Sequence, residues 1–134
     1  MSDCVFCQIV AGNIPSFIIY EDNEFVAFLD ISQIVDGHTL VIPKTHYRWV
    51  WDVPNISSYF EVVQRVARKM QQVSGSSYVK SVTLGVLVEH AHVHLLPETQ
   101  GSASLIDNAW SEAREARKLS ENEMIALKNK FQVK

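Results

Sequence analysis

The strongest periodic pattern in the chain lies in residues 55–74, where apolar residues recur every three or four positions. This spacing places them on one face of an α-helix, and charged residues such as Arg65 and Lys69 fall on the opposite face. Pro54 near the start and Gly75 just after the end are typical of helix termini. The pattern therefore predicts one long helix that buries a single apolar face.

Shorter segments rich in β-branched and aromatic residues predict strands. The first two are separated by Asp22-Asn23, a turn-prone pair that predicts a hairpin. The predicted strands cover residues 17–21, 25–29, 38–43, 78–84 and 88–96. With one long helix before the last pair, this order predicts an α+β fold built on an antiparallel sheet.

Both ends of the chain predict short helices. Residues 3–12 form a compact apolar segment that ends before Pro15, whereas residues 102–117 favour no single element. A final helix is predicted from Ser120, because Glu123 stands three residues later as in a capping box.

With 134 residues and no repeat or linker, the chain is expected to be one domain over residues 1–134.

Composition excludes several classes of function. The apolar fraction of 47% is ordinary for a globular protein, and a net charge of −3 without a basic block argues against binding a long nucleic acid. No apolar run is long enough to span a membrane, and residues 1–4 lack the basic and apolar regions expected of a signal peptide. A cytoplasmic location is therefore expected. In a reducing cytoplasm, Cys4 and Cys7 are metal ligands or free thiols more often than a disulfide.

Three histidines at alternate positions, His90, His92 and His94, are the most informative local feature. On a strand over residues 88–96 they would line one face, about 6.5–7 Å apart, while the apolar residues between them face a core. Imidazole acts near neutral pH as a nucleophile, a general acid or base, or a metal ligand.

Two kinds of chemistry fit this row of histidines. A catalytic metal is one, but the outer two histidines would lie about 13 Å apart along a straight strand, too far to share one ion. Nucleophilic attack on phosphorus is the other, with neighbouring imidazoles stabilising the charge that develops on the phosphate oxygens. His92, flanked on both sides, is the natural nucleophile, and this chemistry needs no metal.

The spacing of Cys4 and Cys7 is that of a zinc knuckle or, in other contexts, of a redox pair. A closed tetrahedral zinc site needs two further ligands, for which His46 and His90 are candidates. The alternative is a pair of reduced, half-buried cysteines.

The segment His90-Ala-His-Val-His94-Leu-Leu resembles the signature of the histidine triad (HIT) superfamily. Other segments are similar to further parts of that family, in particular to its zinc-bearing, Hint-like branch. These are residues 4–15, 20–31 and 37–46, so that the resemblance covers residues 4–46 and 85–97.

The resemblance implies a five-stranded antiparallel sheet with one long helix and a short C-terminal helix, and a homodimer in most branches. It also implies hydrolysis or transfer at the α-phosphate of purine nucleotide conjugates, through a nucleotidyl-histidine intermediate. His92 is then the nucleophile, His94 a phosphate-binding donor, and His90 a supporting donor or a zinc ligand. A structural zinc ion, not needed for the chemistry, is expected on Cys4, Cys7, His46 and His90.

The resemblance further implies a base pocket lined by apolar side chains, with Asp30 accepting hydrogen bonds from the ribose hydroxyls. The pocket residues are Phe6, Ile9, Phe28, Leu29 and Ile31, and His38 is expected to be structural. Val79, Val86 and Leu87 stand where many members carry polar residues near the phosphate. A phosphoramidase-like hydrolase is the expected function. The alternatives are a dinucleoside polyphosphate hydrolase, a nucleotide-binding module with weak catalysis, or a metal-dependent hydrolase.

Overall fold

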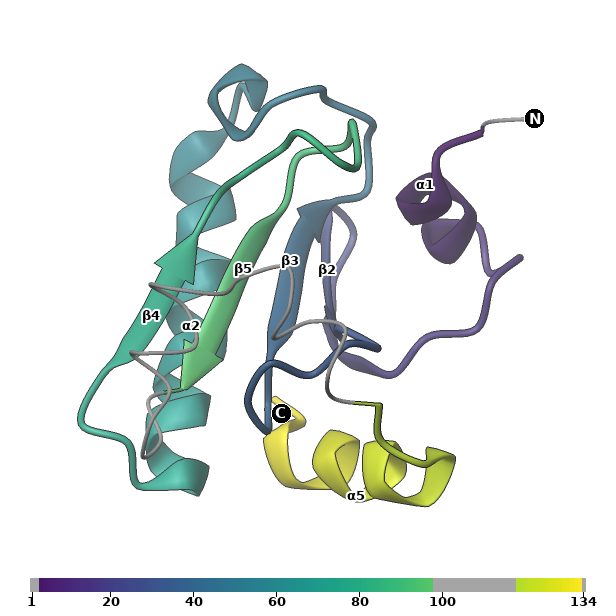
Figure 1. The fold of residues 1–134 in the computed structure, drawn as a ribbon. Helices are drawn as coiled ribbons and strands as arrows, with labels where there is room; N and C mark the ends of the chain where they lie inside the picture. The colour runs from purple at the N-terminus through teal and green to yellow at the C-terminus, as the bar shows by residue number, and fades with distance from the viewer. Residues whose placement is uncertain (1–2, 98–117, 134) are drawn as a thin grey trace.

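A computed structural model describes residues 3–97 and 118–133 of the protein. Its five strands form one antiparallel sheet in the order β1-β2-β3-β5-β4 (Figure 1). In chain order the elements are α1 (Val5–Val10), β1 (Ile18–Glu21), β2 (Phe25–Leu29), β3 (Thr39–Pro43), a 3-10 turn η1 (Val50–Asp52), α2 (Ile56–Ser74), β4 (Val79–Val82), β5 (Val93–Pro97) and α5 (Glu121–Phe131). The predicted α+β class and five-stranded sheet are confirmed.

Helices α1 and α2 lie on opposite faces of the sheet (Figure 1). Because successive side chains on a strand point to opposite faces, β2 contributes to both sides. Phe25 and Leu29 pack in the larger core beneath α2, whereas Val26 and Phe28 pack with Phe6 of α1. All five residues of β2 are buried, since the strand is covered on both faces.

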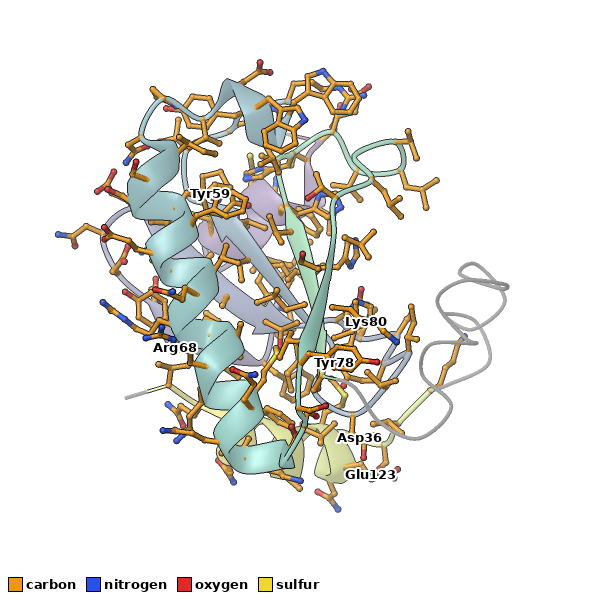
Figure 2. The ribbon with its side chains drawn as sticks, turned by 90° about the vertical axis from the view of Figure 1, so that its left-hand side faces the viewer. Asp36, Tyr59, Arg68, Tyr78, Lys80 and Glu123 are labelled. Atoms are coloured by element: carbon orange, nitrogen blue, oxygen red, sulfur yellow. The ribbon has the colours of Figure 1, made fainter. Side chains whose placement is uncertain are left out.

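The long helix α2 has the predicted bounds to within one residue. Its apolar face includes Tyr59, which is fully buried and donates a hydrogen bond of 2.6 Å from its hydroxyl to the carbonyl oxygen of Val41. Arg68 lies on the outer side of the helix (Figure 2). Gly75 ends the helix in a left-handed conformation, with φ 73°, as expected of a glycine cap.

The C-terminal helix α5 begins at the predicted capping box. The Ser120 side chain accepts from the backbone N–H of Glu123, and the Glu123 side chain accepts from the backbone N–H of Ser120. At the other end of the helix, Phe131 is 1% exposed and packs against Gly37 in the β2–β3 connection. Helix α5 thereby closes one end of the sheet (Figure 1).

The histidine strand is shorter than predicted, because β5 begins at Val93 rather than Val88. The β3–β5 ladder runs from Thr39 to Val41 of β3, and beyond it the backbone N–H of Ala91 bonds to the Tyr47 carbonyl instead. Pro43 has no N–H with which to extend the ladder. His90 and His92 therefore lie in the irregular segment before the strand, and His94 alone lies within it.

Residues 102–117, for which the sequence favours no single element, lie outside the described residues. Within residues 3–97 and 118–133, no helix combines the length and the apolar character needed to cross a membrane.

Candidate active site and metal centre

A small cavity opens between α1 and the segment that leads into β5. Its lining includes His92 and His94 together with Phe6 of α1 and Leu40 of β3. The loop before His90 supplies the remaining wall through Leu84, Gly85, Leu87 and Val88. The cavity thus joins two of the predicted catalytic histidines to one of the residues predicted to bind the base.

His92 is held in one tautomer. Its Nδ1 atom lies 2.6 Å from the backbone carbonyl oxygen of His90, and a carbonyl only accepts, so Nδ1 carries the proton. In the neutral ring the lone pair is then on Nε2, the atom that can attack an electrophile. The ring of Phe6 packs edge-on against His92 at a centroid distance of 5.2 Å, which fixes the orientation of the imidazole.

His94 contacts a second histidine that lies outside the alternating row. Its Nδ1 atom is 2.9 Å from Nε2 of His38, a distance that requires one proton between the two rings. Oδ2 of Asp30 lies 3.7 Å from the same Nε2 atom. All three side chains are buried, with exposures of 3% or less. Asp30, His38 and His94 therefore form one polar chain behind the cavity.

The potential ligand atoms of Asp30, His38 and His94 lie within 4.8 Å of one another, close enough to raise the question of a metal site. The 2.9 Å contact between His38 and His94 is nevertheless that of a hydrogen bond. Two nitrogens on one tetrahedral zinc ion lie about 3.3 Å apart. We therefore interpret the group as a hydrogen-bonded support for His94 rather than as a ligand set.

The β2–β3 connection positions His38 through a buried glutamine. The Gln33 side chain donates to the carbonyl oxygens of Asp30 and His38, at 2.6 and 2.7 Å, and accepts from the N–H of Gly37 at 2.8 Å. Its exposure is 0%. Sequence reasoning missed both Gln33 and the contact of His38 with His94. The sequence offered one signal for this contact: His38 stands at the start of a strand that pairs with the strand containing His94.

A second polar cluster lies at the N-terminal start of α1. It brings together Cys4, Cys7, His46 and His90, with all ligand atoms within 4.8 Å of one another. The Cys4 Sγ–His90 Nδ1 and Cys7 Sγ–His46 Nδ1 distances are both 3.3 Å, and Cys7 Sγ lies 3.5 Å from His90 Nδ1. Sulfur and nitrogen ligands of a tetrahedral zinc ion lie about 3.5 Å apart. The four side chains therefore have the chemistry and the spacing of a closed metal site.

The tautomer of His90 suits metal binding. Nε2 donates to the carbonyl oxygen of Pro43 at 2.8 Å, which leaves the lone pair on Nδ1, the atom that faces the two sulfurs. Burial is the main cause that lowers the pKa of His90, partly offset by the hydrogen bond to Pro43, so the neutral ring is favoured. His92 belongs to neither of the groups of potential metal ligands in the described part of the chain.

The residues predicted to bind the base do not all lie together. Phe6 and Phe28 pack edge to face at 5.5 Å, and Ile9 packs against the same cluster. Ile31 is 73% exposed just beyond β2. Leu29 instead points to the other face of the sheet and packs in the core beneath α2, so its side chain does not join Phe28. The period of two along β2 causes this separation.

Asp30, predicted to bind ribose, has one carboxylate oxygen in a local contact. Oδ1 accepts from the backbone N–H of Ser32 at 2.8 Å, and the side chain as a whole is 3% exposed.

Of the positions that depart from the family pattern, Val79 lies in β4 and packs against the core beneath α2, away from the cavity, whereas Leu87 lines the cavity.

A family model described as "HIT domain" matches residues 11–101. The chain belongs to the HIT-domain family. This HIT protein is 40% identical over 102 residues to "Protein hit" of Bacillus subtilis, covering 71% of this chain and 70% of that protein. It is 33% identical over 109 residues to the adenosine 5'-monophosphoramidase of Saccharomyces cerevisiae, covering 77% of this chain and 67% of the yeast protein.

Solved structures agree with this membership. A zinc-bound histidine triad family protein from Mycobacterium smegmatis has a TM-score of 0.74 and 29% identity, covering 97% of this chain and 91% of that one. A HIT family hydrolase from Clostridium thermocellum has a TM-score of 0.63 and 30% identity, covering 74% of this chain and 93% of that one.

Proposed function

We propose that the protein is a nucleoside phosphoramidase-like hydrolase or nucleotidyl transferase that acts at the α-phosphate of purine nucleotide conjugates. The observation that carries the proposal is the state of His92. Its Nδ1 proton is donated to a backbone carbonyl, so the lone pair of the neutral ring lies on Nε2, and the side chain lines a cavity. The yeast relative, an adenosine 5'-monophosphoramidase, supports the choice of substrate class.

In the proposed reaction, Nε2 of His92 attacks phosphorus and the bond from phosphorus to the amine nitrogen breaks. The amine departs with a proton supplied by His94 or by water. Water then attacks the nucleotidyl-histidine and releases the nucleoside monophosphate, which restores the neutral His92 ring, and a proton from this water replaces the one given to the amine. Hydrogen bonds from His94 stabilise the charge that develops on the non-bridging oxygens as Nε2 of His92 attacks. His38 acts as a positioning residue, because its contact at 2.9 Å fixes the ring of His94.

We further propose that Cys4, Cys7, His46 and His90 hold a structural zinc ion. When bound, the ion cross-links the start of α1 to the segment before β5 and supplies no chemistry to the reaction. This link supports the site, because Phe6 follows Cys4 closely and packs against both His90 and His92. The zinc-bound relative supports the choice of metal.

The nucleoside is proposed to bind along the face of the sheet that α1 covers. Aromatic and aliphatic side chains from Phe6, Ile9, Phe28 and Ile31 would contact the purine without selecting strongly among bases. Asp30 is proposed to accept hydrogen bonds from the ribose hydroxyls on the resemblance to the family alone, because its carboxylate is 3% exposed and is not among the cavity-lining residues.

A homodimer is proposed on the resemblance to the family, and β4 is the outer strand on its side of the sheet, where a second copy could pair. Light scattering of the full chain measures this directly, and a monomer at all protein concentrations contradicts it.

The test of the catalytic proposal compares adenosine 5'-phosphoramidate with a diadenosine polyphosphate, using the wild-type protein and His92→Asn. We expect the phosphoramidate to be hydrolysed and the variant to lose turnover while it still binds adenosine monophosphate. Preferred hydrolysis of the polyphosphate would favour the rival hydrolase. Tight nucleotide binding without a nucleotidyl adduct on His92 would favour a binding module, and activity lost on chelation by a protein that stays folded would favour a metal-dependent hydrolase.

A further inference from the structure

One wall of the histidine cavity is an apolar loop that the proposed chemistry leaves unexplained. Leu84 and Leu87 line the same cavity as His92 and His94, yet they are 41% and 77% exposed. Val86, between them, is 70% exposed. Large apolar side chains exposed together beside a cavity that contains polar groups are typical of a ligand-binding surface. The loop therefore offers a contact surface next to the proposed nucleophile.

The loop is held in place from its outer side. Gly85 has φ +71°, and a Cβ atom there would lie 2.7 Å from the ring of Trp49, so the glycine permits close contact with the indole. The Arg48 guanidinium donates to the carbonyl oxygen of Gly85 at 2.7 Å. With its centre fixed at Gly85, the loop presents Leu84 and Leu87 to the cavity in a preformed arrangement, which lowers the entropic cost of binding.

The charges around the loop do not suit an anionic leaving group. Arg48 is engaged outside the cavity, where it pairs with Glu89 at 3.3 Å and stacks on Trp49 at 3.8 Å from the ring centroid. Among the described residues that line the cavity, none carries a permanent positive charge. A polyphosphate chain that leaves from the α-phosphate needs cationic partners to stabilise its charge. An uncharged apolar group needs only the surface that is present.

We propose that Leu84 and Leu87 form the subsite for the leaving group and select nucleoside phosphoramidates whose amine carries an apolar substituent. The inference rests on the proposed function and deepens it. The bond that breaks joins phosphorus to the amine nitrogen, the bond that forms joins phosphorus to Nε2 of His92, and the amine takes up one proton as it leaves. The apolar substituent stays against the two leucines during this step.

The experiment uses a series of adenosine 5'-phosphoramidates made from methylamine, propylamine and pentylamine, which are of similar basicity and differ in apolar surface. In the wild-type protein we expect kcat/KM to rise along the series, by at most about fourfold per methylene that becomes buried. Leu84→Ser and Leu87→Ser should flatten this rise, so that the loss of kcat/KM grows from the methylamine compound to the pentylamine compound. Both leucines are substantially exposed, so neither variant loses a core contact.

Ile125→Ser is the matched control, because Ile125 is also an aliphatic residue with 41% exposure but lies on α5. It should keep the wild-type dependence on chain length. A flat series in the wild-type protein, with turnover that still requires His92, would overturn the subsite and leave the proposed function standing. An equal loss for methylamine and pentylamine compounds in the leucine variants would also overturn it. Absence of His92-dependent turnover for every compound would overturn the proposed function itself.

Discussion

Replacement of Gly37 by alanine tests whether the contact between α5 and the β2–β3 connection is as close as the structure indicates. Gly37 has φ +98°, and a Cβ atom at this position would lie 2.6 Å from Cζ of Phe131. Phe131 is 1% exposed, so its ring has no room to move without disturbing the packing of α5. The substitution therefore combines backbone strain with a steric clash.

The two contributions can be estimated separately. A left-handed conformation costs an L-residue about 1–2 kcal/mol. Forcing an additional methyl group into a packed core costs about 1–3 kcal/mol. We therefore expect Gly37→Ala to lower the free energy of unfolding by roughly 2–5 kcal/mol, which corresponds to a decrease in Tm of about 8–20 °C for a domain of this size.

Gly75→Ala is the matched control, because Gly75 has φ +73° with no atom within 4 Å of the added Cβ. It should show the backbone contribution alone, about 1–2 kcal/mol. Urea unfolding and thermal melts of both variants measure the difference. If Gly37→Ala is no more destabilising than Gly75→Ala, the close packing of Phe131 on the turn is refuted.

Three further predictions follow from the site and the core. His38→Phe retains a ring but removes the partner of His94 Nδ1, and an unsatisfied buried polar group costs about 1–3 kcal/mol. The kcat/KM for adenosine 5'-phosphoramidate should therefore fall by roughly 5- to 150-fold, while binding of adenosine monophosphate is unchanged. An unaltered rate would contradict the positioning role. Cys7→Ser should reduce the zinc bound per chain, measured by elemental analysis, and lower the Tm relative to wild type, whereas equal zinc content would exclude the proposed ligand set. Tyr59→Phe removes the buried hydrogen bond to the Val41 carbonyl and should lower the free energy of unfolding by about 1–2 kcal/mol in urea, with unchanged stability as the contradictory result.

Local patterns in the sequence were sufficient for the elements that depend on local chemistry. The apolar stripe over residues 55–74 predicted α2, and Ser120 with Glu123 predicted the start of α5, because helix periodicity and capping involve residues close in the chain. Adjacent residues on a strand face opposite sides of the sheet. This alternation alone shows that Leu29 and Phe28, both predicted to line the base pocket, cannot share one face.

The length of the histidine strand could not be read from its own residues. A strand is defined by its partner, and β3 offers β5 a ladder only as far as Val41. His90 and His92 therefore leave the ladder, which allows His90 to turn Nδ1 toward the cysteines and His92 to donate its Nδ1 proton to a backbone carbonyl. A straight strand would have kept the two side chains in one row.

By itself, the sequence determined the α+β class, the bounds of α2, the start of α5 and the residue types that bring imidazole and thiol chemistry into one small domain. Only the tertiary structure decided that His38 supports His94, that Gln33 organises the connection between Asp30 and His38, and that Leu84 and Leu87 border the cavity. The physical reason is sequence separation: capping and periodicity act over a few residues, whereas the contact between His38 and His94 joins residues 56 positions apart and exists only once the sheet has paired its strands.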